Sequence, residues 1–242
     1  MGSNQKTSSV LGHLDELRRR LIRGLIAVAI TSAFSFIFYK QIFSILTSRA
    51  QDINLIFIEM TEMMSTIVRV CLVSGIILAM PYLTYQLIMF VSPALTRREK
   101  RYVYLILPWI AFMFAGGVVF SYFVLIPRVT DFLLTFGSDI ATPQIKIGNY
   151  IAIVTRLLLV IGLVFEMPVV TTFLARIGAV KAKWLVERRK TAIVLAFVLA
   201  AIITPTMDPI NQTFVAVPLV GLYEMSIWLA KLVQRKKPRA VT

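Results

Sequence analysis

Long apolar stretches, separated by short charged segments, dominate the pattern of this chain. A helix needs about 20 apolar residues to cross a hydrocarbon core of about 30 Å. Between Ile147 and Ala175 the apolar residues are interrupted only by Arg156 and Glu166, so this region is interpreted as one span that carries two charges. The pattern predicts an all-α integral membrane protein with six transmembrane helices, at approximately 22–40, 64–92, 101–126, 148–176, 190–204 and 212–230.

The fifth predicted span is too short for an ordinary bilayer. Its charge-free part, Thr191 to Ile203, gives about 20 Å of helix at 1.5 Å per residue. Local thinning of the bilayer is the expected response to such a mismatch.

Proline residues within the spans predict bent helices, and a glycine pair predicts a place where two helices pack closely. Each proline inside a span removes a backbone hydrogen bond that neighbouring groups must replace, so bent helices are expected. The pair Gly116-Gly117 in the third span is interpreted as a place of close helix packing. The prolines inside the predicted spans are Pro81, Pro108, Pro168 and Pro218.

The distribution of charge predicts the orientation in the membrane. The chain has 26 Lys and Arg against 12 Asp and Glu, a net charge of +14. Most of the basic residues fall in the N-terminal segment, the second loop, the fourth loop and the tail, and cytoplasmic loops are enriched in such residues. We therefore expect an inner-membrane protein with both termini cytoplasmic: an amphipathic N-terminal segment (1–21), a six-helix transmembrane domain (22–230) and a basic tail (231–242). Because topology explains the charge, nucleic acid is not an expected partner.

Few residues are suited to catalysis. His13 is the single histidine and Cys71 the single cysteine. An intramembrane Ser/His hydrolase, a His-ligated haem and a multi-histidine metal site are therefore disfavoured. The phosphate-binding pattern G-x-x-x-x-G-K-[ST] does not occur. We expect no enzymatic activity, no metal and no cofactor.

Several motifs follow one another along the chain. The segment 13–21, HLDELRRRL, is amphipathic: Leu14, Leu17 and Leu21 share one face of a helix with Val10, and Glu16 lies opposite. Further along stand Phe90 with SPAL (92–95) and EKR (99–101), then FEMP (165–168), then Thr204-Pro205 with Asp208 and Gln212.

In this order and spacing, the motifs resemble the TatC family, the multispanning receptors of the twin-arginine protein translocase, from about residue 10 to residue 230. The first outer loop, Gln41 to Glu62, departs from the family pattern because it lacks the usual prolines. The resemblance implies a receptor for folded precursors with Arg-Arg signal peptides, driven by the proton gradient. It also implies an oligomeric complex with TatA-type and TatB-type single-span proteins, surrounded by membrane lipids.

At matching positions, the resemblance assigns signal-peptide binding to Glu16, Glu99, Arg18 and Phe90. A carboxylate accepts a guanidinium through two hydrogen bonds, which agrees in kind with this role. Structural alternatives remain open: Glu16 could pair with Arg20 one turn later, and Glu99 could form a capping box with Thr96 at the start of the third span.

Glu166 is the sharpest feature inside the membrane, because an unpaired charge there is costly and marks a functional hypothesis. The resemblance makes it part of a polar concavity used in transport. One alternative is a protonated or water-solvated glutamate that ties helices together. Another is a proton-coupled secondary transporter with Glu166 as carrier, although the paired candidates Glu16 and Glu99 lie on the cytoplasmic surface, where a receptor needs them.

Polar residues surround the exit of the short fifth span. Asp208-Pro209 is typical of an N-cap followed by proline at the first helical position. Thr204 and Gln212 could hydrogen-bond a partner's single helix or satisfy backbone groups of their own turn. The resemblance assigns this region, with Asp208, to contacts with TatA or TatB. Glu224 in the last span is expected to pair with Lys231 or to reach the membrane interface rather than to be functional.

Overall fold

The computed structural model describes residues 3–50, 55–91, 97–135, 144–204 and 208–235. The elements in chain order are α1 (Ser3–Ile37), α2 (Tyr39–Thr47), the 3-10 turn η1 (Ser48–Ala50), β1 (Leu55–Ile56), α3 (Glu62–Val91), α4 (Arg97–Phe120), the π-helical turn η3 (Ser121–Leu125), α5 (Ile126–Thr135), β2 (Ile145–Lys146), α6 (Ile147–Phe165), α7 (Met167–Ile177), α8 (Ala182–Glu187), α9 (Arg189–Ile203) and α10 (Pro209–Arg235).

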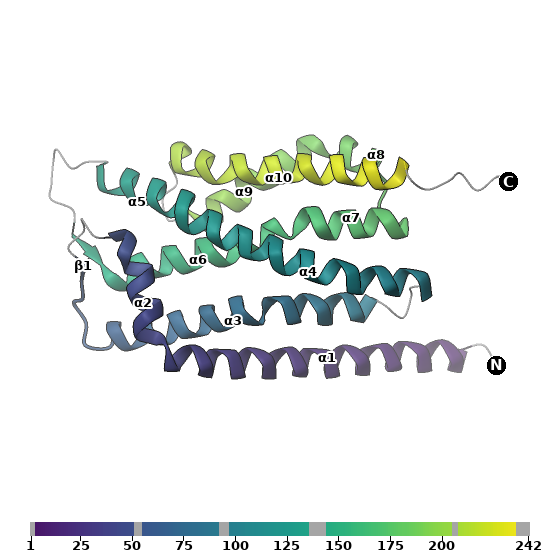
Figure 1. The fold of residues 1–242 in the computed structure, drawn as a ribbon, viewed down its shortest axis with the longest axis horizontal. Helices are drawn as coiled ribbons and strands as arrows, with labels where there is room; N and C mark the ends of the chain where they lie inside the picture. Colours follow the sequence, from purple (N-terminus) through teal and green to yellow (C-terminus); the bar gives the residue numbers. More distant parts are fainter. Residues whose placement is uncertain (1–2, 51–54, 92–96, 136–143, 205–207, 236–242) are drawn as a thin grey trace.

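The long helices lie side by side in one bundle (Figure 1). The start of α1 and the end of α10 lie at the same end of this bundle, which we call the terminal end. The opposite end holds α2 and the strands, and we call it the cap end.

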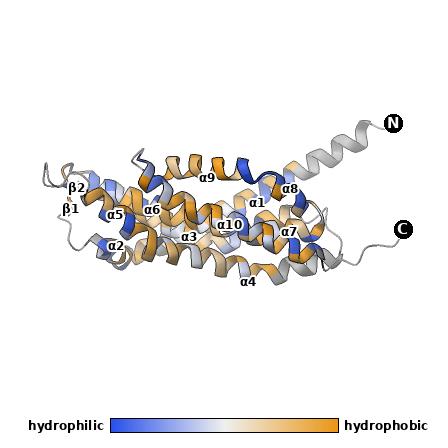
Figure 2. Ribbon diagram, turned by 90° about the horizontal axis from the view of Figure 1, so that it is seen from above, coloured by the Kyte–Doolittle hydropathy of each residue, from blue (hydrophilic) through white to orange (hydrophobic). Residues whose placement is uncertain are grey.

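The predicted helical membrane fold is confirmed in its main features. Five helical stretches are long and apolar enough to cross a membrane: Leu14–Ile37, Glu62–Phe90, Ile106–Thr135, Ile147–Ile177 and Pro209–Gln234. The fifth predicted span corresponds to α9, which is not one of these five stretches and whose 15 residues give about 22 Å of helix. Figure 2 shows α9 as a mostly hydrophobic helix at the edge of the bundle.

Several boundaries differ from the prediction. The third span does not end near residue 126 but continues through η3 and α5 to Thr135, with Pro127 in the first turn of α5, where a missing N–H costs least. The N-terminal segment is continuous with the first span, because α1 runs unbroken from Ser3 to Ile37. The expected first outer loop contains α2 and β1.

Small residues bring neighbouring helices into close contact. α1 and α3 cross where a Cβ atom on Gly75 would lie 2.6 Å from the Cα of Ser32. The Thr31 hydroxyl donates a hydrogen bond of 2.8 Å to the Gly75 carbonyl at the same crossing. On α4, a Cβ on Gly117 would lie 2.8 Å from the Cβ of Phe165, whereas one on Gly116 would meet no neighbour within 4 Å. The interpretation of the glycine pair as a packing site is therefore confirmed for Gly117.

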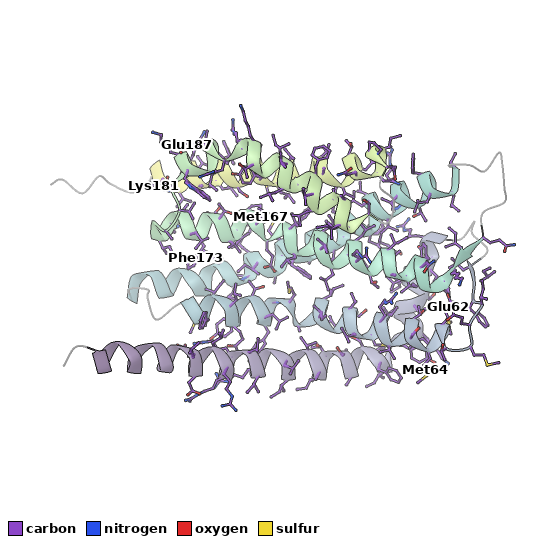
Figure 3. The ribbon with its side chains drawn as sticks, turned by 180° about the vertical axis from the view of Figure 1, so that it is seen from behind. Glu62, Met64, Met167, Phe173, Lys181 and Glu187 are labelled. Atoms are coloured by element: carbon purple, nitrogen blue, oxygen red, sulfur yellow. The ribbon has the colours of Figure 1, made fainter. Side chains whose placement is uncertain are left out.

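The cap end is tied together by segments that are far apart in the sequence. β1 and β2 pair in parallel, with Leu55 opposite Ile145. At the start of α3, the Glu62 carboxylate accepts backbone N–H groups from Ile58 at 3.0 Å and from Gly148 at 3.1 Å. Figure 3 shows Glu62 at this end of the bundle. These contacts hold the first residues of α6 against α3.

Candidate functional site

Glu16 belongs to a polar network that joins α1 to α3 near the terminal end. Its Oε1 accepts hydrogen bonds from Arg20 Nε at 3.0 Å and Nη2 at 2.5 Å. Arg20 Nη1 donates to Gln86 Oε1 at 3.3 Å, and Gln86 Nε2 donates to the Tyr82 hydroxyl at 2.6 Å. The side chains of Arg20 and Glu16 are 17% and 31% exposed. The pairing of Glu16 with Arg20, left open by the sequence, is therefore present.

The surroundings of Glu16 are strongly basic. Asp15 forms a similar but more exposed ion pair with Arg19, also one turn later. These two pairs and Arg23 line a surface cavity of about 310 Å³. Arg18, a predicted binding residue, is exposed on the same helix.

An apolar groove begins directly beside this network. It has a volume of about 500 Å³ and lies between α1 and α3, and we call it the α1–α3 groove. Arg20 and Gln86 contribute polar atoms to it, and the predicted binding residue Phe90 forms part of its wall. The complete lining is Leu17, Arg20, Leu21, Gly24, Leu25, Val28, Leu83, Gln86, Leu87 and Phe90.

Glu166 lies at a break between α6 and α7 and is only 4% exposed. The break has a local cause: Pro168 has no N–H to continue the helical ladder. The Glu166 carbonyl then accepts the N–H groups of both Val169 and Val170. The Thr84 hydroxyl of α3 lies 3.2 and 3.1 Å from the two carboxylate oxygens of Glu166 and donates to that carboxylate. A polar contact between two spans is therefore placed inside the bundle.

A cavity of about 500 Å³ adjoins this contact and is lined by α3, α6 and α7. Figure 3 shows Met167, one of its lining residues, part-way along the bundle. Leu83 and Leu87 line both this cavity and the α1–α3 groove, so the two hollows lie on either side of one ridge of α3. The full lining is Met80, Leu83, Thr84, Leu87, Leu163, Glu166, Met167, Val170 and Thr171.

The polar residues beyond the short helix α9 bond to their own chain. The Thr204 hydroxyl donates to the Ala200 carbonyl at 2.8 Å, and Gln212 Nε2 donates to the Phe197 carbonyl at 2.8 Å. Asp208 Oδ1 accepts the N–H of Asn211 at 2.7 Å, which confirms the predicted N-cap of α10. The open alternative, that Thr204 and Gln212 satisfy backbone groups, is therefore observed for both side chains.

Comparison with known proteins assigns the family. The family model for the Sec-independent protein translocase protein TatC matches residues 12–218. The chain belongs to the TatC family. TatC of Carboxydothermus hydrogenoformans is 38% identical over 234 residues, covering 96% of each chain, and TatC of Aquifex aeolicus is 39% identical over 231 residues, covering 93% of this chain and 95% of the relative.

Solved structures agree with this assignment. A crystal structure described as the twin arginine translocase receptor TatC superposes with a TM-score of 0.84 at 38% identity, and covers 92% of this chain and all of that chain. A second crystal structure, of the same receptor in DDM, gives a TM-score of 0.83. This TatC-family chain is therefore a multi-pass membrane subunit of the Sec-independent translocase, a protein-transport system, rather than a small-molecule transporter that uses Glu166.

For two further glutamates of this TatC-family chain, Glu99 and Glu224, the sequence predicted one contact each. Glu99 lies in the first turn of α4, but its side chain and Thr96 lie outside the described residues, so the capping box stays a prediction. The expected pairing of Glu224 with Lys231 is wrong: Glu224 accepts from Arg189 of α9 at 2.7 Å. α9 and α10 pack directly against each other, which brings Arg189 closer than a residue two turns along α10.

Sequence reasoning offered Arg20 as a partner of Glu16 but missed Gln86, which accepts from Arg20, and Thr84, which donates to Glu166. Gln86 and Thr84 are polar residues within a long apolar span, and their spacing carries no signal of its own. Both are buried in the structure, and each contacts a different hollow of the bundle. The available signal was their polarity inside a span, since such groups in a membrane need a partner.

Proposed function

We propose that this chain is the receptor subunit of a twin-arginine translocase, with the terminal end in the cytoplasm and α9 as a sixth, short span. It binds the Arg-Arg signal peptides of folded precursors and organises TatA-type and TatB-type partners for export driven by the proton gradient. The observation that carries this proposal is the Glu16 network, because it places a carboxylate beside the apolar α1–α3 groove. A twin-arginine signal peptide offers both chemistries, a pair of guanidinium groups and an apolar segment.

Recognition at Glu16 proceeds by exchange of one arginine for another. Arg20 occupies Glu16 Oε1 but also reaches Gln86, so it keeps a hydrogen-bond acceptor when an incoming guanidinium takes its place. The exchange replaces one ion pair with another and therefore adds little net affinity. Burial of the apolar segment in the groove supplies the larger part, at about 25 cal/mol per Å² of apolar surface removed from water.

Glu99 is the second carboxylate of the proposed site. It belongs to the first turn of α4, which begins at the terminal end, where the Glu16 network also lies. Two carboxylates at one end of the bundle match the two arginines of the signal. Arg18, exposed beside Glu16, strengthens the dependence on salt, because a basic surrounding repels a basic peptide at low ionic strength.

The decisive experiment is a titration of the purified protein in lipid nanodiscs with a fluorescent twin-arginine peptide at low salt. Glu16→Gln should weaken binding about threefold, a change of about 0.7 kcal/mol, because the exchange of one arginine for another retains only part of the roughly 1.5 to 3 kcal/mol of a hydrogen bond to a charged group. The matched control is Asp15→Asn, since Asp15 also pairs with an arginine one turn later, but its partner Arg19 does not line the groove, whereas Arg20, the partner of Glu16, does. Equal effects of the two substitutions would show that only general charge matters and would remove Glu16 from the site.

Glu166 is proposed to act in transport and not in signal recognition. Its cavity is separated from the α1–α3 groove by the Leu83 and Leu87 ridge, which a moving segment could cross. Glu166→Ala should reduce transport into vesicles while peptide binding stays within about twofold of the original value. Transport at the original rate would leave Glu166 a structural role only.

The exposed face of α9 is proposed to contact the single-span partners. Leu195 and Val198 are 55% and 48% exposed on this helix. Photocrosslinkers at these two positions should capture TatA-type or TatB-type helices, and a crosslinker at the exposed Phe112 of α4 serves as the control. Gln212→Leu should weaken the capture, because it removes the hydrogen bond that ties α10 to the Phe197 carbonyl of α9. Adducts with lipid alone, in the presence of partners, would contradict this part of the proposal.

A further inference from the structure

Arg156 lies within a span and has an unusual set of contacts. It is exposed on α6, nine residues after the helix begins, which corresponds to about 13 Å along the axis. Its Nη1 donates to the Ile202 carbonyl at 3.4 Å. Among the described residues the ion pairs involve other cations, namely Arg19, Arg20, Lys146 and Arg189. A guanidinium has five N–H donors, so a single long contact uses little of its capacity.

Arg156 completes a polar cluster at the end of α9. The last carbonyls of a helix have no partner within the helix and form the negative end of its dipole. Three side chains donate to carbonyls of α9: Arg156 to Ile202 and Thr204 to Ala200 in the last turn, and Gln212 to Phe197 further back along the helix. We call these three side chains the α9-end cluster. Within this cluster Arg156 uses one of its N–H groups. The other N–H groups of its exposed guanidinium can donate to a ligand outside the protein.

The surroundings of this cluster follow from the lengths of the helices. α9 and α10 stop short of the cap end, whereas α5 and α6 continue towards it (Figure 1). A helix of about 22 Å, next to a core of about 30 Å, leaves its end below the headgroup level of an undisturbed bilayer. Hydrocarbon around the α9-end cluster would leave a charged group without solvation, so polar headgroups must reach down to it.

We propose that Arg156 binds the phosphate of a phospholipid whose headgroup is drawn down to the end of α9. A guanidinium and a phosphate match in geometry and charge, and they form two parallel hydrogen bonds. Leu199 and Ile202, 41% and 65% exposed on α9, provide an apolar surface next to the site for an acyl chain. The site therefore offers a guanidinium for the phosphate and an apolar helix surface for an acyl chain of the same phospholipid. It uses none of the residues of the Glu16 network and does not depend on signal-peptide binding.

Photolabelling tests this site in the complete chain without partner proteins. The protein is placed in nanodiscs of phosphatidylcholine that contain a phosphatidylglycerol with a diazirine near the headgroup, and the adducts are mapped by mass spectrometry. Adducts should concentrate in 152–160 and 199–204. Arg156→Gln should lower their yield at least fivefold and Arg156→Lys less, because lysine keeps the charge but loses the fork of donors. Arg128→Gln, at an exposed arginine of α5, is the matched control and should leave the yield unchanged.

Two further measurements distinguish binding of a phospholipid phosphate from binding of acyl chains alone or of a soluble anion. A diazirine diacylglycerol, which has acyl chains but no phosphate, should label these segments much less. Equal labelling by both probes, or an unchanged yield in Arg156→Gln, would overturn the proposal. Inorganic phosphate added in excess should not compete, and full competition would assign Arg156 to a soluble anion instead. Thermal unfolding of each variant verifies folding, and Arg156→Lys keeps the test valid if Arg156→Gln fails to fold.

Discussion

The two ends of the bundle hold their carboxylates in different ways. At the cap end, Glu62 accepts hydrogen bonds from two backbone N–H groups, those of Ile58 and Gly148. At the terminal end, Glu16 accepts from the side chain of Arg20. A backbone donor leaves only if the chain itself rearranges, whereas a long side chain leaves by rotating about its own bonds. The cap carboxylate is therefore structural, and the terminal carboxylate is available for exchange.

The same contrast extends to the neighbouring contacts. Cap-end bonds join residues that are far apart in the sequence, as in the bond from the Tyr150 hydroxyl to the Leu46 carbonyl and in the pairing of β1 with β2. Both acidic side chains of α1 pair instead with arginines four positions along the same helix. Only Arg20 continues the network to α3, through Gln86. The two glutamates therefore differ in how readily their partners can leave: backbone donors hold Glu62, whereas a side chain that can rotate away holds Glu16.

The largest expected loss of stability comes from removing the Glu62 carboxylate at the cap end. Glu62→Ala removes the acceptor of two backbone N–H groups and should lower the thermal unfolding midpoint in detergent by about 5 °C. The control is Glu59→Ala, because Glu59 makes only an exposed contact of 3.8 Å with Lys146. Similar midpoints for the two variants would show that the cap end is no more fixed than the terminal end.

A smaller loss of stability is expected at the buried tyrosine of the cap. Tyr150→Phe leaves the Leu46 carbonyl without its donor and should cost about 1 kcal/mol. Unfolding in a denaturing detergent measures this change. Tyr85→Phe on α3, where the described contact is between the rings of Tyr85 and Tyr82, should change stability by less than half as much.

At the terminal end, removing Arg20, the partner of Glu16, should change the affinity for a twin-arginine peptide. Arg20→Gln frees Glu16 from its resident guanidinium, so a twin-arginine peptide should bind about threefold more tightly at low salt, a change of about 0.7 kcal/mol. Arg19→Gln removes the same charge from the neighbouring pair and should have a smaller effect. Weaker binding by Arg20→Gln, in a protein with an unchanged unfolding midpoint, would argue against exchange.

The smallest effect is expected for the exposed ion pair between α9 and α10. Arg189 and Glu224 have side chains that are 44% and 45% exposed, and such pairs contribute about 0 to 1 kcal/mol. Arg189→Gln should therefore shift the unfolding midpoint by less than Glu62→Ala or Tyr150→Phe. A shift as large as that of Glu62→Ala would mean that side-chain pairs can hold the bundle as firmly as backbone bonds.

The length of apolar stretches was enough to predict most of the fold. α3 and α10 begin and end close to the predicted spans because their flanks are charged or polar over several residues. The extension of the third span to Thr135 was not predicted, since Pro127, Arg128 and Asp131 resemble a loop when read in order. In the structure they belong to the first turns of α5, with Arg128 and Asp131 exposed. The β1–β2 pairing was also missed, because two-residue strands leave no periodic pattern.

The candidate site was predictable only in part. Glu166 stood out because a charged group in an apolar helix is unusual, and Glu16 because its motif resembles that of a known family. Thr84, which donates to Glu166, and Gln86, which accepts from the Arg20 partner of Glu16, became visible only after α3 was packed against its neighbours. Arg20 is one of several arginines on α1. The spacing along the helix predicts its pairing with Glu16 but does not show that its side chain also reaches Gln86 of α3.

The close crossing of α1 and α3 at Ser32 and Gly75 has a consequence for biogenesis. Every residue of that crossing lies within the first 91 positions, so the first hairpin can assemble while the ribosome is still producing the rest of the chain. The cap end must wait, because Glu62 finds its second donor only when Gly148 has been synthesised and delivered to the same side of the membrane. A nascent chain in which α3 has just emerged from the ribosome would thus already hold the α1–α3 groove, with the opposite end of the molecule still open.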